Sequence, residues 1–355
     1  IITMTISTTG FKVNYFSGAY KERFGDNFLL QALDIFKDKT SPLPKCELDE
    51  LHENMQSVAA SVNRYSTEVD VTERPRSKNR LIEIPHFVTT GSVGAADFQG
   101  RRRTGTQRQT DIGELVSDEG IRQYLKFRQT KEQYLARALF SGQVLAPYTQ
   151  DRPVLDFEDE FGQTVATASV DATKTGNGPL EDLDTAANAM RFALGGWLSS
   201  MRGVVVLCSP EAYKAIKFHP SMLTLVNHGV LPDSNLFNAS VKASLPAFQA
   251  MTVDGLTFVN TGLLYRDFIP AGTAFMVPVF GANNLVGSDL QPFECYHGPA
   301  SRDARLAADG AESFFFQYGW EDHLHNQTIQ SEYGLLPICY NQSMITRLTV
   351  NTAEA

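Results

Sequence analysis

Residues 71–110 hold the feature that most constrains the fold: a long basic stretch with few large apolar side chains. It contains eight Lys or Arg and three Asp or Glu, a local charge of +5 in a chain whose net charge is −9. Arg80–Val88 predicts a strand, because branched and aromatic residues alternate with polar ones. Small residues form the expected tip, and four arginines lie on the return: Arg101, Arg102, Arg103 and Arg108. Such a hairpin cannot bury a core of its own, so it needs a surface outside the subunit.

The rest of the composition indicates a globular chain. With 355 residues, of which 43% are hydrophobic and 20% charged, it can bury a core in one large domain or two close ones. The acidic balance argues against a dedicated nucleic-acid binder and leaves only non-specific proximity to DNA. No apolar run approaches the roughly 20 residues that span a bilayer, so no membrane partner is expected.

Two segments beside the basic stretch have different characters. Residues 1–70 contain short amphipathic pieces, such as the helically spaced apolar residues of 28–36, but no core for an independent domain. They predict an extended N-terminal arm. Residues 117–141 predict the strongest helix, with Ser117 as its N-cap and Gly142 as its end. At about 1.5 Å per residue this helix is roughly 35 Å long, enough for a structural spine.

The segment after the spine is acidic. Pro153–Phe157 and Phe161–Val165 predict two antiparallel strands around the interruption Glu158–Glu160. Between Asp151 and Asp184 nine acidic residues stand against two basic ones, a net charge of −7.

Helices and strands are mixed from about residue 180 to 280. Leu183–Trp197 keeps the helical period until Gly195-Gly196 interrupts it, and Val204–Cys208 predicts a buried central strand. Ser209-Pro210-Glu211 predicts a capped helix start, and Asp254-Gly255 predicts a hairpin turn. Thr273–Phe280 predicts a further strand. The fold class is therefore α+β.

In this order the segments resemble the tailed-bacteriophage major capsid fold, the Hong Kong 97-like (HK97-like) fold, and specifically the lambda-like major capsid protein E family. The resemblance covers nearly the whole chain and is weakest over the first 75 residues. Five phrases carry it by their order and spacing: Pro153–Gly162, Val204–Tyr213, Phe268–Thr273, Thr328–Ser331 and Gly334–Pro337.

The resemblance implies a division of the chain and a role. The expected parts are an N-terminal arm (1–70), an E-loop (71–112), a P-domain with the spine helix (113–180), an A-domain (181–325) and C-terminal strands returning to the P-domain (326–355). The implied role is a structural subunit, not an enzyme, that self-assembles into hexamers and pentamers enclosing double-stranded DNA. Its implied partners are further copies, a scaffolding protein, a portal and a decoration protein. Its location is the virion, after assembly in the host cytoplasm.

The charge map agrees with one property that the resemblance implies, namely an E-loop that lies over a neighbouring subunit. The E-loop candidate carries +5 and the P-domain candidate −7. We therefore expect cations of one subunit to meet carboxylates of the next, each exposed pair contributing about 0–1 kcal/mol. The cations are Arg76, Lys78, Arg80, Arg101, Arg102, Arg103 and Arg108, and the carboxylates are Asp156, Glu158, Asp159 and Glu160.

No residue pattern demands catalysis, a cofactor or a metal. The sequence lacks a phosphate-binding loop and a nucleophile elbow. Glu321-Asp322-His323-Leu324-His325 is the one metal-like cluster, and a solvated loop is the favoured interpretation because no further ligand is defined. The cysteines at 46, 208, 295 and 339 form no C-x-x-C pair, which favours buried thiols in a reducing compartment.

Two other functions remain open at this point. An encapsulin-like compartment shell would share the fold but enclose protein cargo. A soluble α+β enzyme with an unrecognised site would fold as a monomer or small oligomer, which the coreless basic stretch opposes. Covalent crosslinking between subunits is not expected, since Lys78 is the only lysine of residues 71–110 and does not lie at the tip. Reinforcement by a decoration protein is expected instead.

Overall fold

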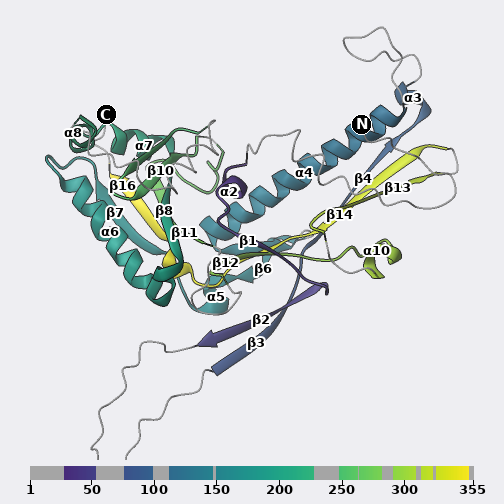
Figure 1. Cartoon of the computed structure of the whole chain (residues 1–355), viewed down its shortest axis with the longest axis horizontal. Coiled ribbons are helices and arrows are strands. Elements are labelled where there is room, and N and C mark those ends of the chain that lie inside the picture. The colour runs from purple at the N-terminus through teal and green to yellow at the C-terminus, as the bar shows by residue number, and fades with distance from the viewer. Residues whose placement is uncertain are drawn as a thin grey trace, which may run out of the picture.

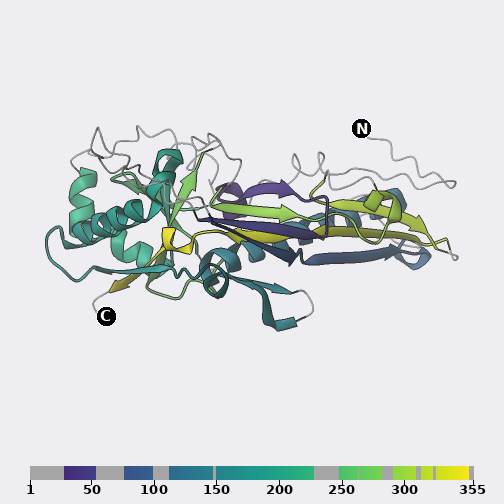
Figure 2. The ribbon, with the colours of Figure 1, turned by 90° about the horizontal axis from the view of Figure 1, so that it is seen from below.

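The computed structural model describes residues 28–52, 76–98, 112–146, 149–227, 248–262, 264–281, 291–308, 313–322 and 325–351. The subunit is elongated, with a six-stranded sheet at one end and a long helix, α4 (Ile112–Ser141), running toward the other (Figure 1). Seen from below it is shallow (Figure 2). The fold is mixed α and β, as predicted.

The six-stranded sheet has three helices on one face. β8 lies inside it, and its alternate residues face opposite sides: Val204 and Val206 pack under the helices, whereas Val205 and Leu207 join the larger core. The strands, in spatial order, are β7 (Ala166–Asp171), β16 (Thr346–Asn351), β11 (Thr273–Phe280), β8 (Met201–Cys208), β10 (Leu256–Asn260) and β9 (Ala250–Val253). The helices are α6 (Gly178–Leu194), α7 (Pro210–Lys217) and α8 (Pro220–Asn227), with η1 (Gly195–Ser200) after α6.

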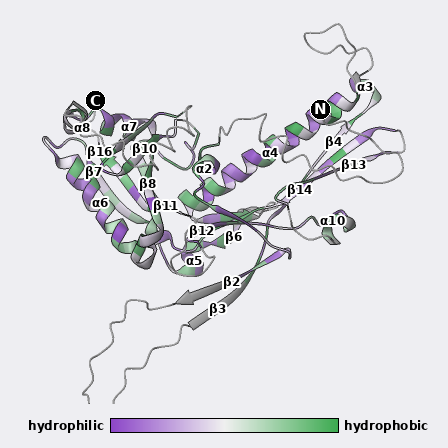
Figure 3. Ribbon diagram, in the orientation of Figure 1, coloured by the Kyte–Doolittle hydropathy of each residue, from purple (hydrophilic) through white to green (hydrophobic). Residues whose placement is uncertain are grey.

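Helix α4 packs along a second, three-stranded sheet. Hydrophobic and hydrophilic residues alternate along α4, as they do along α6 (Figure 3). Its buried Phe127 ring lies 4.8 Å from Tyr333 and 5.2 Å from Phe315, measured between ring centroids. The sheet consists of β13 (Phe316–Glu321), β14 (Gln327–Gly334) and β4 (His86–Val93), with α3 (Ala95–Phe98) and α10 (Ala304–Ala308) nearby in the chain.

A third sheet joins the two ends of the subunit and includes part of the predicted arm. Its strands are β1 (Lys37–Thr40), β12 (Phe293–His297) and β15 (Leu336–Cys339). The short helix α2 (Leu29–Ala32) precedes β1, and Leu29 and Leu30 are fully buried. For residues 28–40 the prediction of an extended arm is wrong, because Leu29, Leu30 and Phe36 fill the subunit's own core. Residues 1–27 lie outside the described residues.

The basic stretch does not pair as predicted. Arg80–Val88 contributes to two strands and not to one. The strand is interrupted at Ile84-Pro85, because Pro85 has no N–H to donate and the Ile84 N–H donates to the carbonyl of Pro44. The first, β3 (Arg76–Glu83), pairs antiparallel with β2 (Lys45–His52), and the second, β4, pairs with β14. The hairpin that extends from the body is therefore β2–β3 (Figure 1). Arg101, Arg102, Arg103 and Arg108 lie outside the described residues.

The acidic segment also differs from its prediction. Pro153–Phe157 does not pair with Phe161–Val165; β6 (Thr149–Asp156) pairs instead with the preceding β5 (Gln143–Ala146). A helix, α5 (Phe157–Phe161), replaces the expected interruption, because the Asp156 carboxylate accepts from the Glu158 N–H and caps it. The chain then enters the six-stranded sheet as β7.

One further prediction needs correction, and others are confirmed. Helix α4 begins by Ile112, so Ser117 lies inside it and cannot be its N-cap. Strand β16 joins the six-stranded sheet, where it pairs parallel with β7. The structure confirms the buried strand at Val204–Cys208, the Ser209 cap of α7 and the Asp254-Gly255 turn between β9 and β10.

Gly142 ends helix α4 with a φ of +67°, and this position offers a test of the spine's boundary. A Cβ there would lie 2.2 Å from Nε2 of the buried Gln342 side chain, whereas Gly162, also at +67°, has nothing within 4 Å. We expect Gly162→Ala to cost about 1–2 kcal/mol from backbone strain alone. Gly142→Ala should lower the free energy of unfolding by more than this, because the Gln342 side chain must also move. Chemical denaturation of dissociated subunits measures both, and equal losses would contradict this account.

Candidate inter-subunit surfaces and the buried polar junction

A buried carboxylate fixes the N-terminal segment to the spine helix. Helix α2 has no side-chain cap of its own. Instead the Glu132 carboxylate accepts from the backbone N–H of Leu30 at 2.7 Å and of Gln31 at 3.3 Å, and from the Gln31 side chain at 3.0 Å. The Tyr265 hydroxyl donates to the same carboxylate. One side chain of α4 therefore satisfies donors from two distant parts of the chain, α2 and Tyr265.

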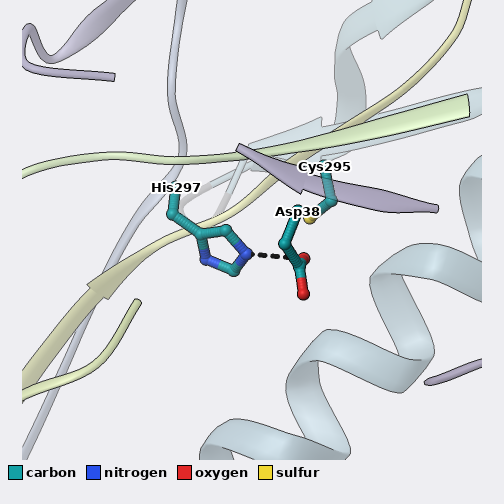
Figure 4. Close-up of side chains that lie close together, drawn as sticks. All are labelled: Asp38, Cys295 and His297. Carbon is teal, nitrogen blue, oxygen red and sulfur yellow. Dashed lines mark hydrogen bonds and ion pairs between the residues drawn. The ribbon is translucent and has the colours of Figure 1, made fainter. Parts of the chain in front are cut away.

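A second cluster lies one residue away along α4. The Lys131 ammonium lies 2.6 and 2.7 Å from the two carboxylate oxygens of Asp38, and Nε2–H of the fully buried His297 donates to Asp38 at 2.8 Å (Figure 4). Burial alone would raise the pKa of Asp38, but the His297 hydrogen bond and the Lys131 charge lower it to about 2. The carboxylate is therefore ionised and paired on both sides.

The same cluster has the composition of a metal site, because ligand atoms of Asp38, Cys295 and His297 lie within 4.8 Å of one another. Asp38 already holds the Lys131 cation against both of its oxygens. Burial raises the pKa of Cys295 to about 12, so the thiol stays protonated and binds metals poorly. The cluster acts as a structural ion pair. Pairing of β1 with β12 brings Asp38 beside Cys295, and no local sequence signal predicts that pairing.

The buried histidine predicts how subunit stability depends on pH. Burial lowers the pKa of His297, so the folded state stays neutral while the unfolded state takes up a proton near pH 6.5. Stability should therefore fall as the pH drops below about 6.5. Asp38 adds a further loss as the pH falls from about 4 toward 2.

We expect the free energy of unfolding to depend less on pH between pH 7 and 5 in His297→Gln than in the wild type. A loss of stability that is the same at every pH does not change this slope. Urea unfolding of dissociated subunits at several pH values measures the slope. His325→Gln is the matched control, because that histidine is exposed. An unchanged slope in His297→Gln would exclude His297 as the group responsible.

The predicted carboxylates lie together on β6 and α5. Asp156, Asp159 and Glu160 border a groove of about 560 Å³ whose opposite wall is the end of β3. Asp156 is occupied as the helix cap and accepts from Gln143 at 2.8 Å, whereas Glu158 and Asp159 are exposed. Glu158 and Asp159 are therefore available for contact with another molecule. The groove is lined by Leu81, Ile82, Glu83, Pro153, Val154, Leu155, Asp156, Asp159 and Glu160.

Three of the predicted cations lie in the described part of the chain, and Arg101, Arg102, Arg103 and Arg108 lie outside it. Arg76, Lys78 and Arg80 belong to β3, where Lys78 stands opposite Glu50 and Arg80 opposite Leu48 of β2. The end of β3, at Leu81–Glu83, borders the acidic groove of its own subunit.

The predicted cluster at Glu321–His325 lies only partly within the described residues. His325 is exposed, and its ring nitrogen pairs with the Glu321 carboxylate at the surface. Of the remaining members, Asp322 belongs to the described chain and His323 lies outside the described residues.

The whole-chain comparison decides the family. The sequence profile of the family described as phage major capsid protein E matches residues 22–350. That range includes every helix and almost every strand residue described above. The chain belongs to the phage major capsid protein E family. No curated protein matches the capsid protein in sequence.

Solved structures agree at the level of the fold. The capsid protein is similar to the capsid of Ralstonia phage GP4, with 9% identity, a TM-score of 0.51, and coverage of 100% of this chain and 97% of the other. It is also similar to the putative capsid protein of a prophage of E. coli CFT073, with 9% identity, a TM-score of 0.54, and coverage of 97% and 100%. The predicted HK97-like fold is confirmed.

The capsid protein is a structural subunit of the phage head and a virion component, and it assembles with copies of itself. It is not an enzyme. The four cysteines are free and buried, as predicted, and burial raises the pKa of Cys46 to about 11 and of Cys339 to about 12. Among the described helices none is long and apolar enough to cross a membrane.

Proposed function

We propose that the capsid protein forms hexamers and pentamers, and that these close into an icosahedral head around double-stranded DNA. The observation that supports this most strongly is the family match over residues 22–350. The β2–β3 hairpin, which extends from the body, takes the role of the E-loop in this proposal. Leu81 on that hairpin is 59% exposed, so it gains a covering surface when the hairpin lies on a second copy.

A separate proposed contact joins the acidic segment of β6 and α5 to the arginines at 101–103 of an adjoining copy. The exposed carboxylates of this segment, Glu158 and Asp159, attract those arginines. Each exposed pair contributes only about 0–1 kcal/mol, so the charges orient the subunits more than they stabilise the shell. Residues 101–110 carry four arginines and no acidic residue, and residues 151–160 carry five acidic residues and one arginine, so their opposite charges support this arrangement.

Charge reversal tests the contact. Arg101→Glu, Arg102→Glu and Arg103→Glu together should slow assembly at low ionic strength, with a smaller effect at high salt because exposed charges are screened. Adding Glu158→Lys and Asp159→Lys should restore assembly. The control reverses three other cations, Lys126, Lys214 and Arg266, with the same change in net charge. Light scattering measures the rate, and unchanged assembly of the triple variant at every ionic strength would end the idea.

The remaining partners are also proposals: a scaffolding protein, a portal and a decoration protein, with assembly in the host cytoplasm. Electron microscopy of particles from infected cells, with nuclease treatment before DNA extraction, tests the cargo. We expect five- and six-membered rings and protected double-stranded DNA. Particles that contain protein cargo and no protected DNA would instead identify an encapsulin-like compartment.

A further inference from the structure

Helix α6 carries the most exposed large apolar side chain in the described part of the capsid protein. Its buried residues, including Leu183, Ala187 and Met190, pack on the six-stranded sheet. Phe192 lies on the same helix with 90% of its surface exposed. Exposed leucines are common in folded proteins, but an almost fully exposed phenylalanine ring on a rigid helix is typical of an interface anchor.

An apolar cavity opens beside the same helix. It has a volume of about 280 Å³ and lies between α6, α8 and the β9–β10 hairpin. Its walls are mostly hydrophobic, with three charged side chains among the lining residues. The lining residues are Leu180, Leu183, Asp184, Ala187, Arg191, Met222, Val253, Asp254, Leu256 and Phe258.

The exposed ring and the cavity cannot meet within one chain. Successive residues of an α-helix are rotated by about 100°, so Phe192, nine residues after Leu183, points to the opposite side of α6. Leu183 lines the cavity. Because the ring points away from this wall of its own cavity, Phe192 can reach such a cavity only on a second molecule.

We propose that Phe192 of one capsid subunit inserts into the cavity beside α6 of the next subunit in the same ring. The two surfaces are different parts of one chain, so the contact is heterologous, and a repeated heterologous contact closes into a ring when its rotation allows. The protein assembles with copies of itself, and α6 lies at the end of the subunit remote from the tip of α4 (Figure 1). This inference rests on the proposed hexamers and pentamers.

A cysteine pair tests the contact in assembled particles. Asp184→Cys and Phe192→Cys are introduced together, one at the cavity and one at the position of the ring. Eight residues of helix separate them by about 12 Å, too far for a disulfide within one chain, which needs Cα atoms about 4.4–6.8 Å apart. The four native cysteines are buried and do not compete.

Oxidation of the double variant should give a ladder ending at covalent pentamers and hexamers on a non-reducing gel, and each single variant should stay monomeric. Rings that are visible by electron microscopy but yield no ladder would overturn this inference and leave the proposed function intact. Particles without five- and six-membered rings would overturn the proposed function itself.

A second variant keeps the test valid if the cysteine pair does not assemble. Phe192→Ala should raise the subunit concentration needed for assembly about tenfold or more, and Phe192→Leu should recover most of the loss, because leucine still fills an apolar cavity. Assembly of Phe192→Ala at the wild-type concentration would contradict the contact.

Discussion

Replacing Glu132 with alanine is expected to lower the free energy of unfolding of dissociated subunits by roughly 3–5 kcal/mol, since each buried donor left unsatisfied costs about 1–3 kcal/mol. The variant loses the acceptor for the backbone N–H of Leu30, the Gln31 side chain and the Tyr265 hydroxyl. Because these donors hold α2 against the spine helix, the N-terminal segment should also loosen. Urea denaturation measures the first effect, and amide hydrogen exchange at Leu30 and Gln31 measures the second.

The matched control is another glutamate of the same helix. Glu119 pairs at the surface with Arg122 at 3.5 Å, so Glu119→Ala should change stability by no more than about 1 kcal/mol. Glu132→Gln should fall between the two, because its amide keeps one acceptor oxygen. If Glu132→Ala and Glu119→Ala lose equal stability, the buried carboxylate does not fix the segment as described.

Replacing Phe157 with alanine should cost about 3–5 kcal/mol, the usual penalty for removing a phenylalanine ring from a packed core. Phe157 is fully buried and begins α5, which leads the chain from the β5–β6 pair into the six-stranded sheet. Its ring lies 6.1 Å from that of Phe161. The resulting cavity should weaken both α5 and the capped turn that presents Glu158 and Asp159.

Phe192→Ala removes the same atoms from a surface position and is the control for this prediction. Because Phe192 is exposed in the subunit, its loss should change subunit stability by less than about 0.5 kcal/mol. Thermal unfolding of dissociated subunits measures the stability of Phe157→Ala and of Phe192→Ala. A large loss in Phe192→Ala would show that the ring packs within its own subunit, and would also remove the basis for the inter-subunit contact.

Local features of the sequence predicted several elements correctly. The Ser209 hydroxyl caps α7 by accepting from the Ala212 N–H, and Asp254-Gly255 turns the chain between two strands with positive φ angles. Gly142 ends the spine helix, and the apolar run at Val204–Cys208 is a central strand. The cap, the turn and the helix end depend on how a residue interacts with the backbone next to it in the sequence. The strand depends on a run of apolar residues too long to remain exposed.

Pairing between distant strands was the part that sequence reasoning missed. Backbone hydrogen bonds are the same for every residue type, so a strand carries little information about its partner. The prediction therefore paired the basic strand with the arginine-containing segment that follows it in the sequence. In the structure β3 pairs with β2, which precedes it in the sequence. Likewise Asp38 and His297, separated by 259 positions, meet only because β1 lies parallel to β12.

By itself the sequence determined the family, the α+β class and the ends of the locally encoded helices and turns, because order, composition and caps are properties of short segments. Only the tertiary structure decided which strand forms the projecting hairpin, how Glu132 and Lys131 hold the N-terminal segment, and that Phe192 remains outside while Phe157 is inside. The physical reason is that burial is a competition among all apolar surfaces of the chain, and its outcome depends on the packing of the whole subunit.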